Sequence, residues 1–341
     1  MAIQVKARGI GFRTASAFDG NRFEEFAFAV PRPARSDLLV KIEAVGANPV
    51  DLVQIRNTVG ILPTPRIVGF DAAGTIIAKG PDAVLFEPGE HVFFAGTPNR
   101  QGFYATYGLV DERIVGHAPQ NLPAVAAAGI PLAFLTSWET LVDKMGLAPT
   151  AANDHKTILI VNAAGGVGSI AVQLAKIFGL FVIATAGRPA SAKWVAENGA
   201  DAVLDHNRPL APQLKQQGLP PVDYVFDLYG PDTRFTDFAE LIAPLGKIVS
   251  IGQSRTALPL YLLKHKAASF AWEWMFAKPF YNLENLKTQH EALEEAAGLI
   301  EKGLLKPALA HTLKGLSTFS VQSALEALDR HDTIGKIAIE I

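Results

Sequence analysis

The pattern of apolar and polar positions changes character partway along the chain. Up to about residue 123, short β-branched or alternating runs are separated by proline and glycine turns, as at Leu38–Ile42, Thr75–Ile77 and His91–Phe94. These runs predict a β-rich first domain. The segment Leu122–Gly146 then becomes rich in alanine with leucine at helical spacing, which predicts a helix.

From Ile158 onward the pattern alternates between short apolar runs and amphipathic segments. We expect strands at 158–161, 181–185, 202–204, 224–227 and 247–251, and helices at 169–178, near 191–198 and near 233–243. Regular strand–helix alternation with short loops predicts a parallel, doubly wound sheet, and therefore the α/β class.

The C-terminal part has no such alternation. It is expected to form a long helix at 283–302, a helix at 320–330 and a final strand at 336–341. We therefore expect this tail to complete the first domain. The predicted organisation is a first domain of residues 1–123 completed by 276–341, and a second domain of residues 124–275.

The most informative stretch is a small-residue turn that joins the first of these strands to its helix. It reads Ala163–Gly168, with alanine in the first glycine place of a dinucleotide-binding turn. Small residues allow a tight turn and a close approach of helix to strand. The first helical N–H groups, at Gly165, Gly166, Val167 and Gly168, lack helical partners and favour a pyrophosphate. The turn predicts a bound dinucleotide.

The end of the second strand indicates which dinucleotide binds. An NAD-binding chain usually has an acidic residue there, which grips the ribose 2′-hydroxyl. Here the stretch runs through Thr185 and Gly187 to Arg188 and has no carboxylate, while Lys193 follows closely. Cationic side chains suit a 2′-phosphate. We predict NADPH as the cofactor.

Composition and net charge exclude several classes of partner and of chemistry. Apolar residues make up 49% and charged residues 19% of the 341 positions, and the net charge is −2. A net charge this close to zero gives the protein no overall electrostatic attraction to nucleic acid or to an anionic membrane. The chain starts without a signal-peptide pattern and has no uninterrupted apolar run of membrane-spanning length, so we expect a cytoplasmic protein. With no cysteine, disulfides, thiolate nucleophiles and cysteine-based zinc sites are excluded.

Nearly the whole chain resembles the medium-chain dehydrogenase/reductase superfamily, in its quinone oxidoreductase and zinc-type alcohol dehydrogenase-like branch. The matching pieces occur in the family's order: Asn48–Asp51, Ile67–Gly74, Glu87–Val92, Leu135–Trp138, Ala163–Gly168, Glu197–Asp201, Asp223–Gly230, Gly246–Gly252 and Gly335–Ile337. The resemblance implies a GroES-like catalytic domain beside the Rossmann sheet.

The departures from this family pattern concern the metal. Phe70 stands where the zinc enzymes carry a metal-binding histidine, and Asp71 replaces the neighbouring glutamate. Asn48 occupies the region of the catalytic cysteine ligand. A catalytic zinc needs three protein ligands, so we expect none here. The resemblance then implies NADPH-dependent reduction of a quinone or an α,β-unsaturated carbonyl, because such acceptors take hydride without a metal.

The resemblance also implies candidate roles for individual residues. Asn48 would hydrogen-bond the substrate oxygen or the nicotinamide region, Thr136 would lie near the nicotinamide, and Tyr104 is a candidate proton donor. Beyond the pyrophosphate contacts, the residues expected to line the cofactor are His206, Tyr229, Gly252, Gln253 and Lys336. Each has an ordinary structural alternative, such as a turn residue for Asn48 and a strand aromatic for Tyr104.

Two other functions stay open from the sequence. One is a redox sensor that binds NADPH without catalysis, and the other is an alcohol dehydrogenase. The aromatic run at 270–281 could form an apolar substrate wall or pack an interface. We expect a homodimer, with 258–263 as a candidate contact at a sheet edge.

Overall fold

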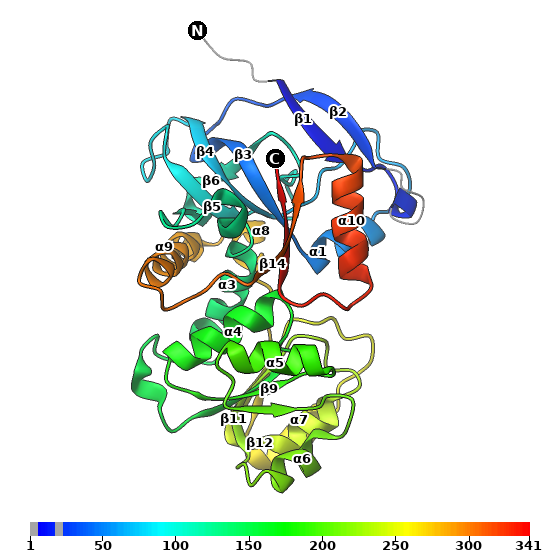
Figure 1. The fold of residues 1–341 in the computed structure, drawn as a ribbon, viewed down its shortest axis with the longest axis vertical. Coiled ribbons are helices and arrows are strands. Elements are labelled where there is room, and N and C mark those ends of the chain that lie inside the picture. The colour runs from blue at the N-terminus through cyan, green and yellow to red at the C-terminus, as the bar shows by residue number, and fades with distance from the viewer. Residues whose placement is uncertain (1–5, 18–22) are drawn as a thin grey trace. The chain divides into compact units, whose positions relative to one another are not determined.

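The structure is a computed structural model that describes residues 6–17 and 23–341 (Figure 1). The chain forms two compact units, and each is described here by itself. The first unit comprises residues 1–132 and 276–341, and the second comprises 133–275. The first division therefore falls at residue 132, nine residues beyond the expected boundary at 123.

The first unit contains most of the antiparallel structure. Its elements are β1 (Lys6–Gly11), η1 (Ala15–Ala17), β2 (Glu24–Ala29), β3 (Asp37–Ala47), α1 (Pro49–Arg56), β4 (Asp71–Lys79), β5 (His91–Ala95), β6 (Tyr107–Asp111), η2 (Glu112–Ile114), β7 (Val115–His117), α2 (Ala124–Ala127), α8 (Ala277–Tyr281), η6 (Glu284–Lys287), α9 (Thr288–Glu301), β14 (Leu309–Lys314), α10 (Thr318–Asp329) and β15 (Lys336–Glu340). The short helix α2 contacts β3, β4 and β15, which explains why its segment belongs to this unit.

The main sheet of the first unit joins segments from both ends of the chain. Its strand order is β14-β15-β3-β4-β5-β7, with β6 also paired to β3, and a separate two-stranded sheet pairs β1 with β2. Strand β15 runs antiparallel to β3, with Ile337 opposite Ala47. Helix α10 contacts α1, β14 and β15 (Figure 1). This register places Lys336 next to the turn that carries Asn48.

The second unit has the alternating elements that the sequence predicts. Its elements are α3 (Pro131–Glu139, which begins in the first unit), the π-helix η3 (Thr140–Lys144), η4 (Ala151–Asn153), β8 (Thr157–Val161), α4 (Gly166–Ile177), β9 (Phe181–Thr185), α5 (Pro189–Glu197), β10 (Ala202–Leu204), α6 (Leu210–Gln216), β11 (Val222–Asp227), α7 (Phe235–Leu241), β12 (Ile242–Ser250), η5 (Leu260–Lys266) and β13 (Ser269–Trp272).

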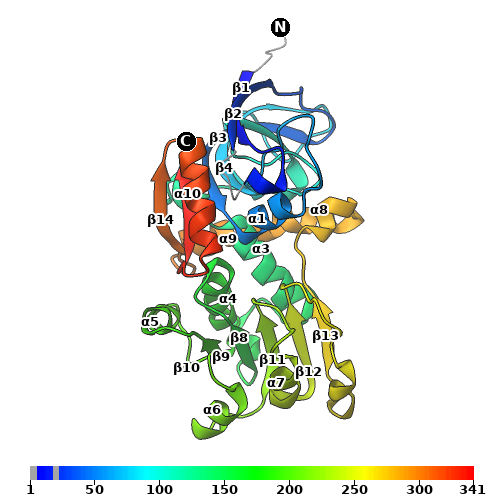
Figure 2. The same ribbon diagram turned by 90° about the vertical axis from the view of Figure 1, so that its right-hand side faces the viewer.

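All strand pairs of the second unit are parallel, in the order β10-β9-β8-β11-β12-β13 (Figure 2). The predicted α/β class with a doubly wound sheet is confirmed. The strand order reverses between β8 and β11, and α/β sheets bind ligands beyond the carboxyl ends of the strands at such a switch point.

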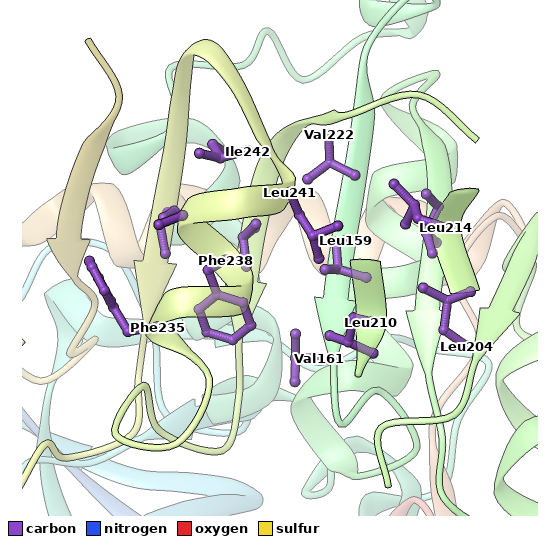
Figure 3. Close-up of a cluster of buried hydrophobic side chains, with 14 of the residues drawn as sticks. Leu159, Val161, Leu204, Leu210, Leu214, Val222, Phe235, Phe238, Leu241 and Ile242 are labelled. Carbon is purple, nitrogen blue, oxygen red and sulfur yellow. The ribbon is translucent and has the colours of Figure 1, made fainter. Parts of the chain in front are cut away.

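One face of this sheet is covered by an apolar core (Figure 3). Leu159 and Val161 of β8 belong to the same buried cluster as Phe235 and Phe238 of α7. Large buried side chains like these contribute about 1.5–3 kcal/mol each on burial. The core therefore holds the loop before α7 in a fixed place beside the sheet.

Two details differ from the sequence interpretation. The segment Leu258–Leu263, proposed as a sheet-edge contact, instead enters the 3-10 helix η5, and the edge strands of the sheet are β10 and β13. The stretch Ala124–Lys144 is long and apolar enough to span a membrane by composition, but 83% of its apolar window is buried inside the structure. Among the described residues it is the one such stretch, and its burial is that of a core helix.

Candidate functional site

The glycine turn of the second unit has the geometry that a dinucleotide needs. Strand β8 ends at Val161, Gly165 precedes the helix in extended conformation, and α4 begins at Gly166. A Cβ built on Gly168 would lie 2.4–2.5 Å from backbone atoms of Ala163, so only glycine fits there. A Cβ built on Gly165 would meet nothing within 4 Å. The space beside Gly165 and the free helix N-terminus fit a pyrophosphate.

The end of β9 lies against the loop after β10. The hydroxyl of Thr185 accepts the backbone N–H of Asn162 at 2.9 Å and lies 3.1 Å from Nδ1 of His206. A Cβ on Gly187 would lie 2.6 Å from Nε2 of His206. Gly187 therefore allows the imidazole to pack against the strand end, where sequence reasoning expected a cofactor contact.

The two predicted cations of this region differ in their surroundings. Arg188 is exposed at the N-cap of α5, and its charge is close enough to His206 to lower the pKa of that imidazole. Lys193 lies 3.7 Å from Glu197 on the exposed surface of the same helix. Exposed pairs of this kind are weak, so Lys193 could exchange its partner for a phosphate.

Tyr229, Gly252 and Gln253 lie in the loops after β11 and β12. The buried carboxylate of Asp227 ties these loops together, because it accepts the backbone N–H of Tyr229 and Gly230 and the hydroxyl of Ser250. Burial raises the pKa of Asp227. A Cβ on Gly252 would lie 2.4 Å from Gly230, so glycine is needed for the two loops to touch.

The first unit holds a buried polar network that connects three predicted residues with two that were missed. Lys336 donates to Oδ1 of Asn48 at 2.6 Å, to Oδ2 of Asp71 at 2.8 Å and to the carbonyl of Ala47 at 3.2 Å. Asn48 in turn donates to Asp71 at 2.8 Å. The other oxygen of Asp71 accepts the backbone N–H of Leu132 at 2.6 Å.

Asp51, one turn into α1, forms the second half of this network. Its carboxylate accepts the backbone N–H groups of Asn48 at 2.9 Å and Gly69 at 3.0 Å, and the hydroxyl of Tyr104 at 3.1 Å. Burial raises the pKa of Asp51 to about 7 despite these donors. The Asn48–Asp51 spacing, an N-cap followed by an acid at the third helical position, was the sequence signal that could have found it.

These contacts change the roles proposed for Asn48, Tyr104 and Lys336. The amide hydrogens of Asn48 point to Asp71 and to the carbonyl of Gly46, so in this geometry they do not reach out to a substrate. Tyr104 is fully buried with its hydroxyl on Asp51, and burial raises its pKa well above the usual range, so it is badly placed as a proton donor. The ammonium group of Lys336 donates three hydrogen bonds, all to groups of the first unit.

Asp51 gives a pH-dependent prediction. Its pKa rises from about 4 in the unfolded chain to about 7 in the fold, so the folded state binds the extra proton between these values. The contribution of protonated Asp51 to the free energy of unfolding is therefore fully present below pH 4 and is lost as pH rises through 7. In urea unfolding from pH 5 to pH 8, the stability of the native protein relative to Asp51→Asn should fall. A difference that is flat or grows with pH would contradict this.

The donor set of the first unit does not fit a zinc ion of the alcohol dehydrogenase type. Phe70 is fully buried and contacts Phe276 edge-on, with ring centroids 5.5 Å apart. Asp71 is occupied by Lys336 and Asn48. Over residues 6–17 and 23–341, no group of three or more histidine, aspartate or glutamate side chains could hold a metal ion.

Of the remaining predicted residues, Thr136 lies in the second unit, and the aromatic run at 270–281 is divided between the second unit, up to residue 275, and the first unit, from residue 276. Thr136 is 4% exposed on α3. Of the aromatic run at 270–281, Trp272 and Trp274 are 46% and 42% exposed, whereas Phe276 is buried in the first unit. Arg234, before α7, was missed by sequence reasoning and donates to the backbone carbonyl of His206.

Comparison with known proteins gives consistent matches over the whole length. Residues 34–120 match the family model of the alcohol dehydrogenase GroES-like domain, and residues 166–280 match that of the zinc-binding dehydrogenases. A zinc-type alcohol dehydrogenase-like protein of Staphylococcus aureus is 42% identical over 95% of this chain and 96% of its own. A chloroplastic quinone-oxidoreductase of Triphysaria versicolor is 31% identical over 91% and 92%. The crystal structure of Escherichia coli quinone oxidoreductase complexed with NADPH has a TM-score of 0.83 at 25% identity, and covers 98% of this chain and 100% of that one.

Proposed function

We propose, from the premise that the chain belongs to the medium-chain dehydrogenase/reductase superfamily of oxidoreductases, that it reduces a quinone or an α,β-unsaturated carbonyl with NADPH and without a metal ion. One observation carries this proposal. Phe70 fills the place where metal-dependent relatives carry a histidine ligand, and the ammonium group of Lys336 holds Asp71 in the neighbouring place. Without a Lewis acid, the acceptor has to be activated by its own conjugation.

The nucleotide side of the proposal is supported by the second unit. The family's nicotinamide chemistry agrees with the glycine turn, and relatives named for quinone reduction and for NADPH stand among the matches. NADPH in particular is supported by Arg188 and His206 at the end of β9 and by the lack of a carboxylate in the stretch Thr185–Arg188. A cationic strand end selects a 2′-phosphate over a hydroxyl.

When bound, NADPH would supply a hydride to the electron-poor carbon of the acceptor. The N–H groups of Gly166, Val167 and Gly168 would hold the pyrophosphate at the start of α4. The network of Lys336, Asp71 and Asn48 would hold the turn into α1 in a fixed conformation. Negative charge on the reduced acceptor is delocalised, so water can supply the proton.

A parallel assay tests the proposal directly. NADPH and NADH are each offered with a panel of quinones, enones, aldehydes and alcohols, and cofactor absorbance is followed. We expect turnover with NADPH and with quinones or enones, and at least ~10-fold lower kcat/KM with NADH, the loss expected for about 1.4 kcal/mol of phosphate contact. Equal rates with NADH, or turnover of simple alcohols alone, would contradict the proposal. No turnover in any arm would favour the sensor alternative.

We also propose that the protein is a homodimer that pairs through the edge strand β13. This strand is one of the two edge strands of the six-stranded sheet, and Trp272 at its end is 46% exposed. Exposed strand edges with large apolar side chains favour pairing with another chain. Sedimentation velocity should give a dimer that becomes monomeric in Trp272→Lys. A native monomer at micromolar concentration would contradict it.

A further inference from the structure

We propose that Arg234 is a specificity-determining residue for the nucleotide, which positions His206 and adds its own charge to a cluster that binds a 2′-phosphate. We call Arg188, His206 and Arg234 the adenosine cluster. The inference rests on the proposed use of NADPH and deepens it, because it concerns how the protein would tell a phosphorylated ribose from a plain one.

The first step is where Arg234 comes from. It ends the loop between β11 and α7, and the next residue, Phe235, is buried in the core. His206 follows β10. Strands β10 and β11 lie on opposite sides of β8 (Figure 2). The guanidinium of Arg234 therefore joins two loops across the switch point of the sheet, by donating to the backbone carbonyl of His206.

The second step concerns the donors that remain. A guanidinium has five N–H groups, and the contact with His206 is the one hydrogen bond that the Arg234 side chain makes within the described part of the chain. Arg234 is only half-buried. Since the guanidinium fork matches phosphate geometry, it can hold the loop and still offer N–H groups to an anion at this end of the sheet.

The third step is the state of the imidazole between the two arginines. Burial, then the charge of Arg234, lowers the pKa of His206, Asp205 on its own loop opposes this, and Arg188 lowers it further. Arg208 is engaged by Asp205 at 3.2 Å. Thr185 lies 3.1 Å from Nδ1, and Nε2 is the ring atom nearest to the position of a Cβ on Gly187. The charges of Arg234 and Arg188 favour the neutral form of the His206 imidazole. A bound 2′-phosphate dianion would offset these charges, so that the imidazole could then take up a proton.

The site therefore supplies three groups for one phosphate, from the loops after β9, β10 and β11. Loss of Arg234 should remove a charge-assisted contact and loosen the His206 loop. It should leave the pyrophosphate turn at Gly166 and Gly168 unchanged, because that turn makes its own contacts in α4. The effect should consequently appear in the affinity for a 2′-phosphate and not in that for the rest of the nucleotide.

The experiment measures binding by calorimetry, with adenosine 2′,5′-bisphosphate and 5′-AMP as probes. In Arg234→Gln the affinity for the bisphosphate should fall about 10- to 100-fold, as expected for a charge-assisted contact, while that for 5′-AMP stays within about twofold. Arg234→Lys should recover most of the loss. The matched control Arg208→Gln, on the His206 loop but paired with Asp205, should change neither by more than about threefold.

A second readout separates a direct electrostatic role from a merely structural one. The ring of His206, assigned by its disappearance in His206→Asn, is titrated by NMR in the native protein and in Arg234→Gln. Removal of the neighbouring cation should move its midpoint to higher pH. Unchanged bisphosphate affinity in Arg234→Gln, or an unchanged midpoint, would overturn this inference and leave the proposed function standing. A native protein that does not prefer the bisphosphate to 5′-AMP would overturn the NADPH preference and the inference with it.

Discussion

Replacement of Lys336 by methionine is expected to lower the free energy of unfolding by about 3–5 kcal/mol, the cost of leaving a buried charge without its partner. Lys336 is 4% exposed and Asp71 is fully buried, and their atoms lie 2.8 Å apart. Methionine keeps the length of the side chain but supplies no donor to Asp71 or Asn48. The change is measured by chemical denaturation at pH 8.

A control variant tests the cause of this loss. The exposed pair Arg56–Asp329, at 2.6 Å with side chains 48% and 31% exposed, should contribute below about 1 kcal/mol, as Arg56→Gln would show. A loss in Lys336→Met no larger than that in Arg56→Gln would mean that the buried pair is not what holds β15 to the turn at Asn48.

The second large effect is expected at the glycine turn, where substitution of either of two glycines should weaken NADPH binding but only one of the two substitutions should destabilise the fold. In Gly168→Ala the new Cβ would lie 2.4 Å from the carbonyl oxygen of Ala163, so α4 has to move away from β8. Overpacking of this kind costs about 1–3 kcal/mol. We expect reduced thermal stability together with loss of NADPH binding.

Gly165→Ala is the matched variant, because its Cβ would meet no protein atom within 4 Å and its φ of −77° suits any residue. It should fold with native stability and still bind NADPH more weakly, since the methyl group occupies space left for the pyrophosphate. Calorimetry with NADPH and a thermal melt are run on both variants. Native affinity in Gly165→Ala would show that the pyrophosphate lies elsewhere.

The fold of the second unit could be predicted well, because its strands are buried on both faces and read as continuous apolar runs. Strand β8 and the start of α4 follow directly from the Ile158–Gly168 sequence. Elements with weak patterns were missed. Helix α6 contains a proline, and β14 is mostly exposed with a mixed sequence. The segment at Leu258–Leu263 was expected at a sheet edge but leads into the short helix η5, in which Leu263 is buried in the core whereas Leu260 and Tyr261 are exposed.

The candidate site was predicted only in part, for a physical reason. Residues that touch a cofactor through backbone atoms, such as Gly166 and Gly168, leave a local sequence signal. Side chains that form hydrogen bonds with residues far away in the sequence leave no such local signal. Asp71 and Lys336 are separated by 265 positions, and Arg234 reaches His206 from a different loop. For the same reason the hydrogen bonds that turn Asn48 and Tyr104 inward could not be read from their own motifs.

The central claim is metal-independent reduction with NADPH, and one measurement tests it most directly. The purified protein is dialysed against a strong chelator, its zinc content is determined, and the rate of NADPH oxidation with a quinone or an enone is compared with that of the undialysed protein. We predict an unchanged rate with far less than one zinc per chain, because Phe70 and the Lys336–Asp71 pair leave no ligand set. A rate that disappears with the chelator and returns with stoichiometric zinc would contradict the account.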